Sequence, residues 1–207
     1  MDIKNSISLI LILTTAVFTD SCKQTTEVTA GHGVIIPLKV GNTWVEKYTF
    51  YDTLGNSTNN YIDSLKVTSD TVIENERWYS YTNFTYNGLF TNRPGGYYMR
   101  YRNAYDTSYT TILFWKYPVN QNEIYYVQNA GTFVKSINDN VTTAAGSFNC
   151  IQYRFQYTKQ PGRPNSGHEQ AWLCPGIGPV LTMGYDVTLS GNEYLYFSVE
   201  LISYKLN

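Results

Sequence analysis

From Thr43 to the C-terminus, apolar and polar residues alternate along most of the chain. Trp44, Tyr48 and Phe50 fall on one side of an extended segment, and the same alternation returns over 193–205. A period of two residues, rich in Tyr, Thr, Val and Phe, is typical of β-strands. Outside the N-terminal segment, no stretch combines a 3.6-residue period with helix caps, so we expect an all-β domain.

Clusters of Gly, Asn, Asp and Pro divide this domain at regular intervals and mark turns. The segments between them predict about ten or eleven strands, near 43–52, 59–68, 77–86, 96–103, 109–116, 123–128, 131–137, 147–157, 168–174, 178–188 and 193–205. Short connections favour antiparallel pairing of consecutive strands. So many strands in one twisted sheet usually curl or close. We therefore expect a single strongly curled antiparallel sheet, a half-barrel or barrel, with a two-sheet β-sandwich as the alternative.

The N-terminus carries a different signal, an apolar run over 7–18 behind the single basic residue Lys4. Twelve residues rise only about 18 Å as a helix, which is too short for a hydrocarbon core of about 30 Å. The run indicates a secretory signal peptide. A buried N-terminal helix is the alternative, although a helix without a polar face suits a membrane better than a protein surface.

The residues Thr19-Asp20-Ser21-Cys22 end this run and resemble a bacterial lipobox. The resemblance implies that 1–21 are a signal peptide removed on export and that Cys22 becomes the lipid-modified first residue. The alternative is ordinary secretion with Cys22 as a free thiol. Residues 22–36 are expected to be a lipid-anchored flexible tether and 37–207 a single β domain.

Charge excludes several classes of function. The chain has 15 Lys and Arg against 16 Asp and Glu, so no basic surface is expected to bind nucleic acid. Few charges and many aromatic residues also exclude a disordered protein. With three Cys and two His in the chain, we expect no metal site and no cofactor.

Cys150 and Cys174 form the sharpest testable pair. If 147–157 and 168–174 form a hairpin, residues whose numbers sum to 324 face each other, which places the two cysteines opposite one another. A disulfide there is compatible with an exported protein and would stabilise the fold by roughly 3–4 kcal/mol. The alternative is two separately buried thiols.

Aromatic residues are unusually common, with 20 tyrosines in 207 residues. Alternating Tyr side chains can simply cover both faces of a twisted sheet, because the ring packs while the hydroxyl stays wet. The functional alternative is a concave aromatic surface for a ligand. Its candidate residues are Tyr79, Tyr81, Tyr97, Tyr98, Tyr101, Trp115 and Trp172.

We find no catalytic constellation in the sequence. His168 and Glu169 are neighbours at the edge of an expected loop, which is typical of a solvated strand entry. We therefore expect a non-enzymatic protein that binds or carries an apolar ligand in a curled sheet. The alternative is a structural, interaction or glycan-binding protein of the outer membrane, whose partner would be another envelope protein or a sugar.

Three motifs carry a resemblance to a known group: Pro37-Leu38-x-x-Gly41-Asn42-x-Trp44, Ala145-Gly146-x-Phe148 and Trp172-x-x-Pro175-Gly176-x-Gly178-x-Val180. Together they resemble uncharacterised outer-membrane lipoproteins of Bacteroidetes type. The resemblance implies an envelope-anchored β protein and carries no assigned catalytic residues. Lys23 follows the lipid cysteine and no acidic cluster comes after it, which favours the outer membrane and its periplasmic side.

Overall fold

The computed structural model describes residues 33–82, 88–103, 108–127, 130–157 and 166–207. They form an all-β fold of twelve strands. The strands are β1 (Thr43–Tyr51), β2 (Ser57–Ile73), β3 (Glu76–Tyr81), β4 (Leu89–Arg93), β5 (Gly96–Arg102), β6 (Tyr109–Lys116), β7 (Ile124–Val127), β8 (Ala130–Thr143), β9 (Gly146–Gln156), β10 (His168–Cys174), β11 (Gly178–Val187) and β12 (Glu193–Lys205).

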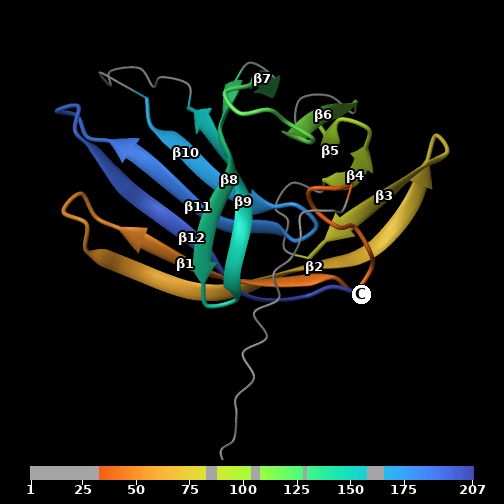
Figure 1. Ribbon diagram of the computed structural model, residues 1–207, viewed down its shortest axis with the longest axis horizontal. Coiled ribbons are helices and arrows are strands. Elements are labelled where there is room, and N and C mark those ends of the chain that lie inside the picture. Colours follow the sequence, from red (N-terminus) through yellow and green to blue (C-terminus); the bar gives the residue numbers. More distant parts are fainter. Residues whose placement is uncertain (1–32, 83–87, 104–107, 128–129, 158–165) are drawn as a thin grey trace, which may run out of the picture.

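All twelve strands belong to one antiparallel sheet in the order β6-β5-β4-β3-β2-β1-β12-β11-β10-β9-β8-β7. The sheet curls strongly, so that β6 and β7, the two edge strands, come into contact (Figure 1). β6 and β7 are not paired through their backbones in the strand order, and side-chain contacts hold this edge together instead. The Tyr153 hydroxyl donates to the Lys116 carbonyl at 2.8 Å, and Lys116 forms an ion pair with Glu123. The predicted single curled sheet is confirmed, and a two-sheet sandwich is not what forms.

Two local predictions were wrong. No strand was expected between the turn clusters Asn87-Gly88 and Arg93–Gly96, but Leu89–Arg93 form β4 between β3 and β5. The Asn138-Asp139-Asn140 cluster was expected to end a strand, yet β8 runs through it. The register of β8 against β9 shifts between Ser136 and Asp139, so the strand accommodates these polar residues as a bulge rather than a turn.

The start of the domain is fixed by Asn42, which is buried next to β1. Its Nδ2 donates to the Pro37 carbonyl at 3.0 Å, and its Oδ1 accepts the backbone N–H of Asn207 at 2.9 Å. Gly41 precedes it with a φ of +95°, and a Cβ there would lie 2.6 Å from Nδ2 of Asn207. The Gly-Asn pair therefore links the first strand to the last residue of the chain.

The last residues of the expected tether, 22–36, lie inside the folded domain. Ile35 and Ile36 are 1% and 5% exposed. The backbone N–H of Gly176 donates a hydrogen bond to the Val34 carbonyl at 2.9 Å. Nδ2 of Asn92 donates a hydrogen bond to the Ile36 carbonyl, also at 2.9 Å. Folded structure thus begins before residue 37, because two adjacent isoleucines are buried against the core. The predictions for residues 1–32, including lipidation of Cys22, lie outside the described residues.

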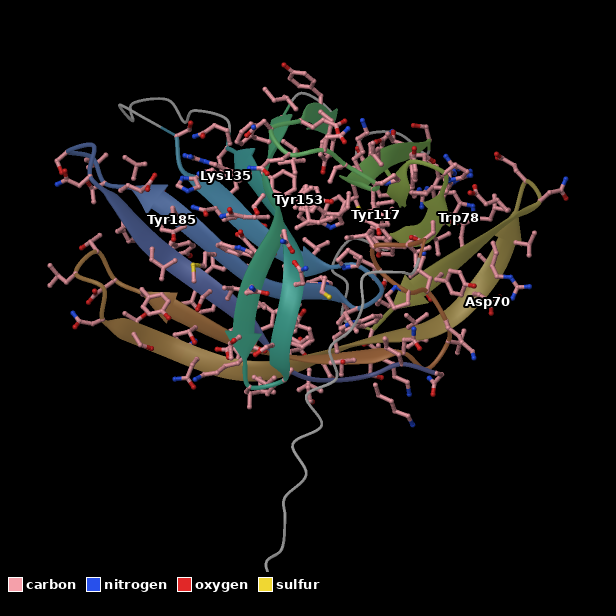
Figure 2. The ribbon with its side chains drawn as sticks, in the orientation of Figure 1. Asp70, Trp78, Tyr117, Lys135, Tyr153 and Tyr185 are labelled. Atoms are coloured by element: carbon pink, nitrogen blue, oxygen red, sulfur yellow. The ribbon has the colours of Figure 1, made fainter. Side chains whose placement is uncertain are left out.

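Aromatic side chains fill much of the interior of the curled sheet. Trp44, Phe90 and Tyr153 are at most 1% exposed, and the indole N–H of Trp44 donates to the Ile177 carbonyl at 2.7 Å. Tyr153 lies at the centre of the molecule (Figure 2). The core therefore occupies much of the interior. In the described ranges we find no helix that would be long and apolar enough to span a bilayer.

Candidate functional site

A cavity lies inside the curled sheet, where β5 and β6 face β9 and β10. Its volume is about 580 Å³, within the range of roughly 300–1,000 Å³ that is usual for small-molecule pockets. Five of its eleven lining residues are aromatic. The lining set is Met99, Tyr101, Ile112, Phe114, Trp115, Val127, Ala130, Phe155, Gln156, Tyr157 and Glu169. Such a lining suits a largely apolar molecule.

Strand pairing explains why these side chains meet. Met99 on β5 lies opposite Ile112 on β6, and Phe155 on β9 lies opposite Glu169 on β10. Directly opposed residues of antiparallel strands project from the same face of the sheet. Because the sheet curls, the β5–β6 face and the β9–β10 face become two walls of one cavity.

Trp115 connects the cavity to the filled core. The indole is 6% exposed and packs edge-on against two rings of β9, with centroid distances of 4.9 Å to Tyr153 and 4.9 Å to Phe155. Edge-to-face packing of this kind holds the rings in a defined geometry. The cavity is therefore bounded by side chains whose positions the core fixes.

One carboxyl group lines this apolar cavity. The Tyr157 hydroxyl donates to Oε2 of Glu169 at 3.0 Å. Burial raises the pKa of Glu169, and the hydrogen bond from Tyr157 opposes that shift. Burial also raises the pKa of Tyr157, and the neighbouring Glu169 charge acts in the same direction. The site thus combines aromatic walls with a partly buried acid.

The seven aromatic residues singled out in the sequence do not form one surface. Tyr101 and Trp115 line the cavity. Tyr81 and Tyr97 lie in the core, where the Tyr97 hydroxyl donates to the Tyr81 hydroxyl at 3.1 Å. Tyr79 packs against the same core from β3.

The other two aromatic candidates make polar contacts elsewhere. Tyr98 stacks under the Arg93 guanidinium, whose carbon is 4.9 Å from the ring centre. The indole N–H of Trp172 donates to Oδ2 of Asp139 at 3.0 Å, which joins β10 to β8. Neither residue lines the cavity.

The sequence reasoning missed Phe155, Tyr157 and Glu169 as cavity residues. A signal was available for one pair, because the rule that paired residues of β9 and β10 sum to 324 places Phe155 opposite Glu169, as observed. The wall that faces them, on β5 and β6, depends on how far the sheet curls. Period-two patterning carries no information about that.

The same register places the two cysteines near each other. Ile151 pairs with Leu173, so Cys150 and Cys174 follow as the next opposed positions. Both are buried and are free thiols in the structure. A hydrogen bond between the two thiols raises the pKa of Cys150 and lowers that of Cys174. A disulfide between them stays a prediction.

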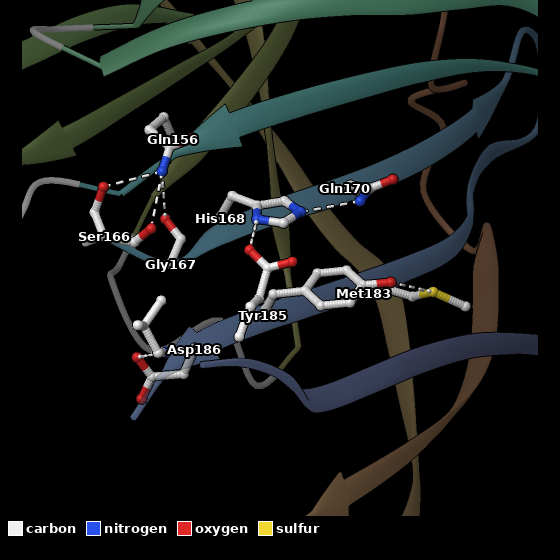
Figure 3. A network of polar contacts seen from close by, with 10 residues as sticks. Gln156, Ser166, Gly167, His168, Gln170, Met183, Tyr185 and Asp186 are labelled. Atoms are coloured by element: carbon white, nitrogen blue, oxygen red, sulfur yellow. Dashed lines mark hydrogen bonds and ion pairs between the residues drawn. The ribbon is translucent and has the colours of Figure 1, made fainter. Parts of the chain in front are cut away.

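His168 belongs to a separate polar network (Figure 3). Adjacent residues of a strand project to opposite faces, so His168 points away from the face that carries Glu169. Its ring stacks on Tyr185 with centroids 4.6 Å apart. Its Nδ1 lies 3.0 Å from Oε2 of Glu193, and the Gln170 amide donates to its Nε2 at 3.0 Å.

This network orients the histidine without activating a nucleophile. Burial lowers the pKa of His168, the Arg154 charge acts in the same direction, and Glu193 opposes both. In the residues that the structure describes, no Ser, Thr or Cys side chain hydrogen-bonds to the ring. Among the same described residues, no group of three His, Cys, Asp or Glu side chains lies close enough together to hold a metal ion.

Comparison with known proteins gives the fold its context. No protein-family model matches the chain, and no curated protein is significantly similar to it. Two solved structures resemble it. A candidate exported protein with a YmcC-like fold from Bacteroides fragilis is 14% identical and matches with a TM-score of 0.47 over 84% of this chain and 100% of its own. A candidate lipoprotein from Parabacteroides distasonis is 18% identical, with a TM-score of 0.52 over 84% of this chain and 100% of its own, so the two chains share a fold.

Proposed function

We propose that this protein is a non-catalytic, lipid-anchored protein of the bacterial cell envelope that binds or carries an apolar ligand inside its curled sheet. In this proposal Cys22 holds the chain to the outer membrane and the β domain faces the periplasm. The cavity of about 580 Å³ between β5–β6 and β9–β10 is the observation that carries the ligand-binding part.

The composition of the cavity supports binding rather than catalysis. Its ionisable groups among the described residues are one carboxyl and two phenols, and Tyr157 already holds the carboxyl of Glu169. Acid–base catalysis usually needs a second group poised to accept or return a proton. The nearest histidine in sequence, His168, projects from the opposite face of β10.

Two observations support the anchor. The sequence places Ser21-Cys22 directly after a short apolar run, and a candidate lipoprotein shares the fold. Cells fed an alkyne-bearing palmitate analogue should label the wild-type chain in the membrane fraction. The Cys22→Ser chain should stay unlabelled, and a labelled Cys22→Ser chain would contradict lipidation at this residue.

Ligand binding is best tested by native mass spectrometry of the Cys22→Ser mature chain purified from a periplasm. We expect a discrete bound mass that organic extraction releases. Ile112→Trp should displace it, because the larger side chain fills the cavity. Ile62→Trp is the matched control, since Ile62 is 63% exposed on β2 and does not line the cavity. Loss of the bound mass from both variants, or from neither, would contradict binding at this site.

A second function, docking of a glycan or an envelope protein, is favoured by a group of aromatic side chains on β1, β2 and β12. Tyr61 and Tyr196 are 45% and 46% exposed, and Tyr48 stacks face to face on Tyr61 at 4.8 Å. Exposed rings of this kind can stack on sugars or anchor a protein partner. Under this alternative, Tyr61→Ala combined with Tyr196→Ala would abolish crosslinking in whole envelopes, while Ile112→Trp would leave it unchanged.

A further inference from the structure

The cavity contains one feature that a purely apolar ligand would not use, the carboxyl group of Glu169. Glu169 is partly buried on β10 and takes part in the lining. Its hydrogen-bond donor is the Tyr157 hydroxyl at 3.0 Å. A carboxylate can accept several hydrogen bonds at once, so one phenol leaves most of its capacity unused.

Among the described residues, no basic side chain forms an ion pair with Glu169. The recorded ion pairs of Lys, Arg and His in those residues join other carboxylates, and none joins Glu169. Arg154 neighbours Phe155, the residue opposite Glu169, but it pairs with Gln170 across β9 and β10 and shares that face with His168, opposite to Glu169. Among the described residues, the carboxyl in the cavity therefore has no cationic partner.

A partly buried carboxylate without a cationic partner is unfavourable, because it loses hydration and gains little in return. A ligand that enters the cavity removes still more water from it. The group must then either take up a proton or meet a positive charge. Burial already raises the pKa of Glu169, in line with this cost.

The walls favour a positive charge. Tyr101, Phe114, Trp115, Phe155 and Tyr157 bring aromatic rings to the same cavity. Aromatic faces attract cations, and aromatic cages are a recognised binding environment for ammonium groups. The same rings, together with Met99, Ile112 and Val127, would cover an apolar body.

We propose that the ligand of this cavity is an organic ammonium ion, a protonated amine on an apolar body, with its charged nitrogen held by Glu169 and the aromatic walls. This inference rests on the proposed ligand-binding function. It adds the sign of the ligand's charge and the residue that selects it.

Three probes with the same body and different head groups test the proposal: 4-phenylbutylamine, 4-phenylbutanol and 4-phenylbutanoate. Binding of each to the Cys22→Ser mature chain is measured by titration calorimetry at neutral pH. We expect the amine to bind at least about tenfold more tightly than the alcohol, and the carboxylate to bind most weakly, because a charge-assisted contact is worth about that much.

Glu169→Gln separates charge from shape, because the amide keeps the size of the side chain and an oxygen that can accept from Tyr157. We expect this variant to lose the preference for the amine while it binds the alcohol as the parent does. Glu193→Gln is the control, since Glu193 is outside the lining set and should leave all three affinities unchanged.

The outcomes separate this inference from the proposed function. If the alcohol binds and the amine binds no better, or if Glu169→Gln keeps the amine preference, the ammonium inference is overturned and ligand binding stands. If none of the three probes binds the parent chain, and native mass spectrometry also finds no bound mass, both proposals fail.

Discussion

Replacement of Asn42 tests whether the link between the first strand and the C-terminus stabilises the domain. Asn42→Ala removes the donor to the Pro37 carbonyl and the acceptor for the Asn207 N–H. Each buried group left without a partner costs roughly 1–3 kcal/mol. Water can reach Asn207, which is exposed, so we expect a total loss of about 2–3 kcal/mol. For a domain of this size, that lowers the Tm by about 4–12 °C.

The Asn42→Asp variant adds a prediction of how the loss of stability changes with pH. At neutral pH its charged carboxylate faces the Pro37 carbonyl, an acceptor, with no donor in place of Nδ2. This raises its folded-state pKa above the unfolded value of about 3.9. The loss of stability is therefore small near pH 3, grows as the pH rises past 4, and levels off above the folded-state pKa.

Urea unfolding of the wild type and both variants between pH 3 and 8, followed by tryptophan fluorescence, measures these differences. Asn59→Ala is the control, because Asn59 is exposed on β2 and pairs only through its backbone. The reasoning is refuted if Asn42→Ala unfolds within about 0.5 kcal/mol of the wild type. It is equally refuted if the Asn42→Asp deficit does not change with pH.

Three further predictions use other parts of the fold. Gly184→Ala should destabilise the domain by about 1–3 kcal/mol in urea, because a Cβ there would lie 2.0 Å from the Phe197 ring; Phe197→Leu should suppress most of that loss, and an unchanged loss would contradict the steric cause. The pKa of His168 is lowered in the folded protein, so its contribution to folding stability is complete above the unfolded pKa of about 6.5 and is lost as the pH falls below it. His168→Gln should therefore flatten the dependence of stability on pH between pH 7.5 and 5. A pH dependence identical to that of the wild type would exclude His168 as its cause. Oxidised protein with a Cys150–Cys174 disulfide should be more stable than Cys150→Ser by roughly 3–4 kcal/mol, whereas labelling of both thiols in unreduced, unfolded protein would show that the bond does not form.

The sequence was sufficient for the strands but not for their curvature. The sequence predicted β1, β6 and β10 within a residue at each end, because turn residues bound each of them. It missed β4, whose five residues are too few to establish a period beside Asn87-Gly88 and Pro94-Gly95. It also ended β8 too early, at residue 137, because a bulge and a turn use the same polar residues.

The candidate site was less predictable than the fold. Tyr97 and Tyr101 lie on the same face of β5 and look alike in the sequence, yet Tyr97 is buried in the core and Tyr101 lines the cavity. They differ in their position along β5, and what faces each position across the curled sheet depends on pairings among all twelve strands. Glu169 was likewise read together with His168, although neighbours in a strand serve opposite faces.

The burial of Ile35 and Ile36 fixes the end of the sheet at which the chain enters the fold. The chain enters the fold beside Gly178, at the C-terminal end of β10, because a Cβ on Gly178 would contact Ile36. Glu169 and the cavity lie near the other end of that strand. Five residue steps of a strand separate Glu169 from Cys174, about 17 Å. A chain anchored through Cys22 would therefore hold its cavity on the side away from the entering chain. Under the proposed function, a ligand would then exchange with the aqueous phase and with proteins that move in it, rather than directly with the bilayer.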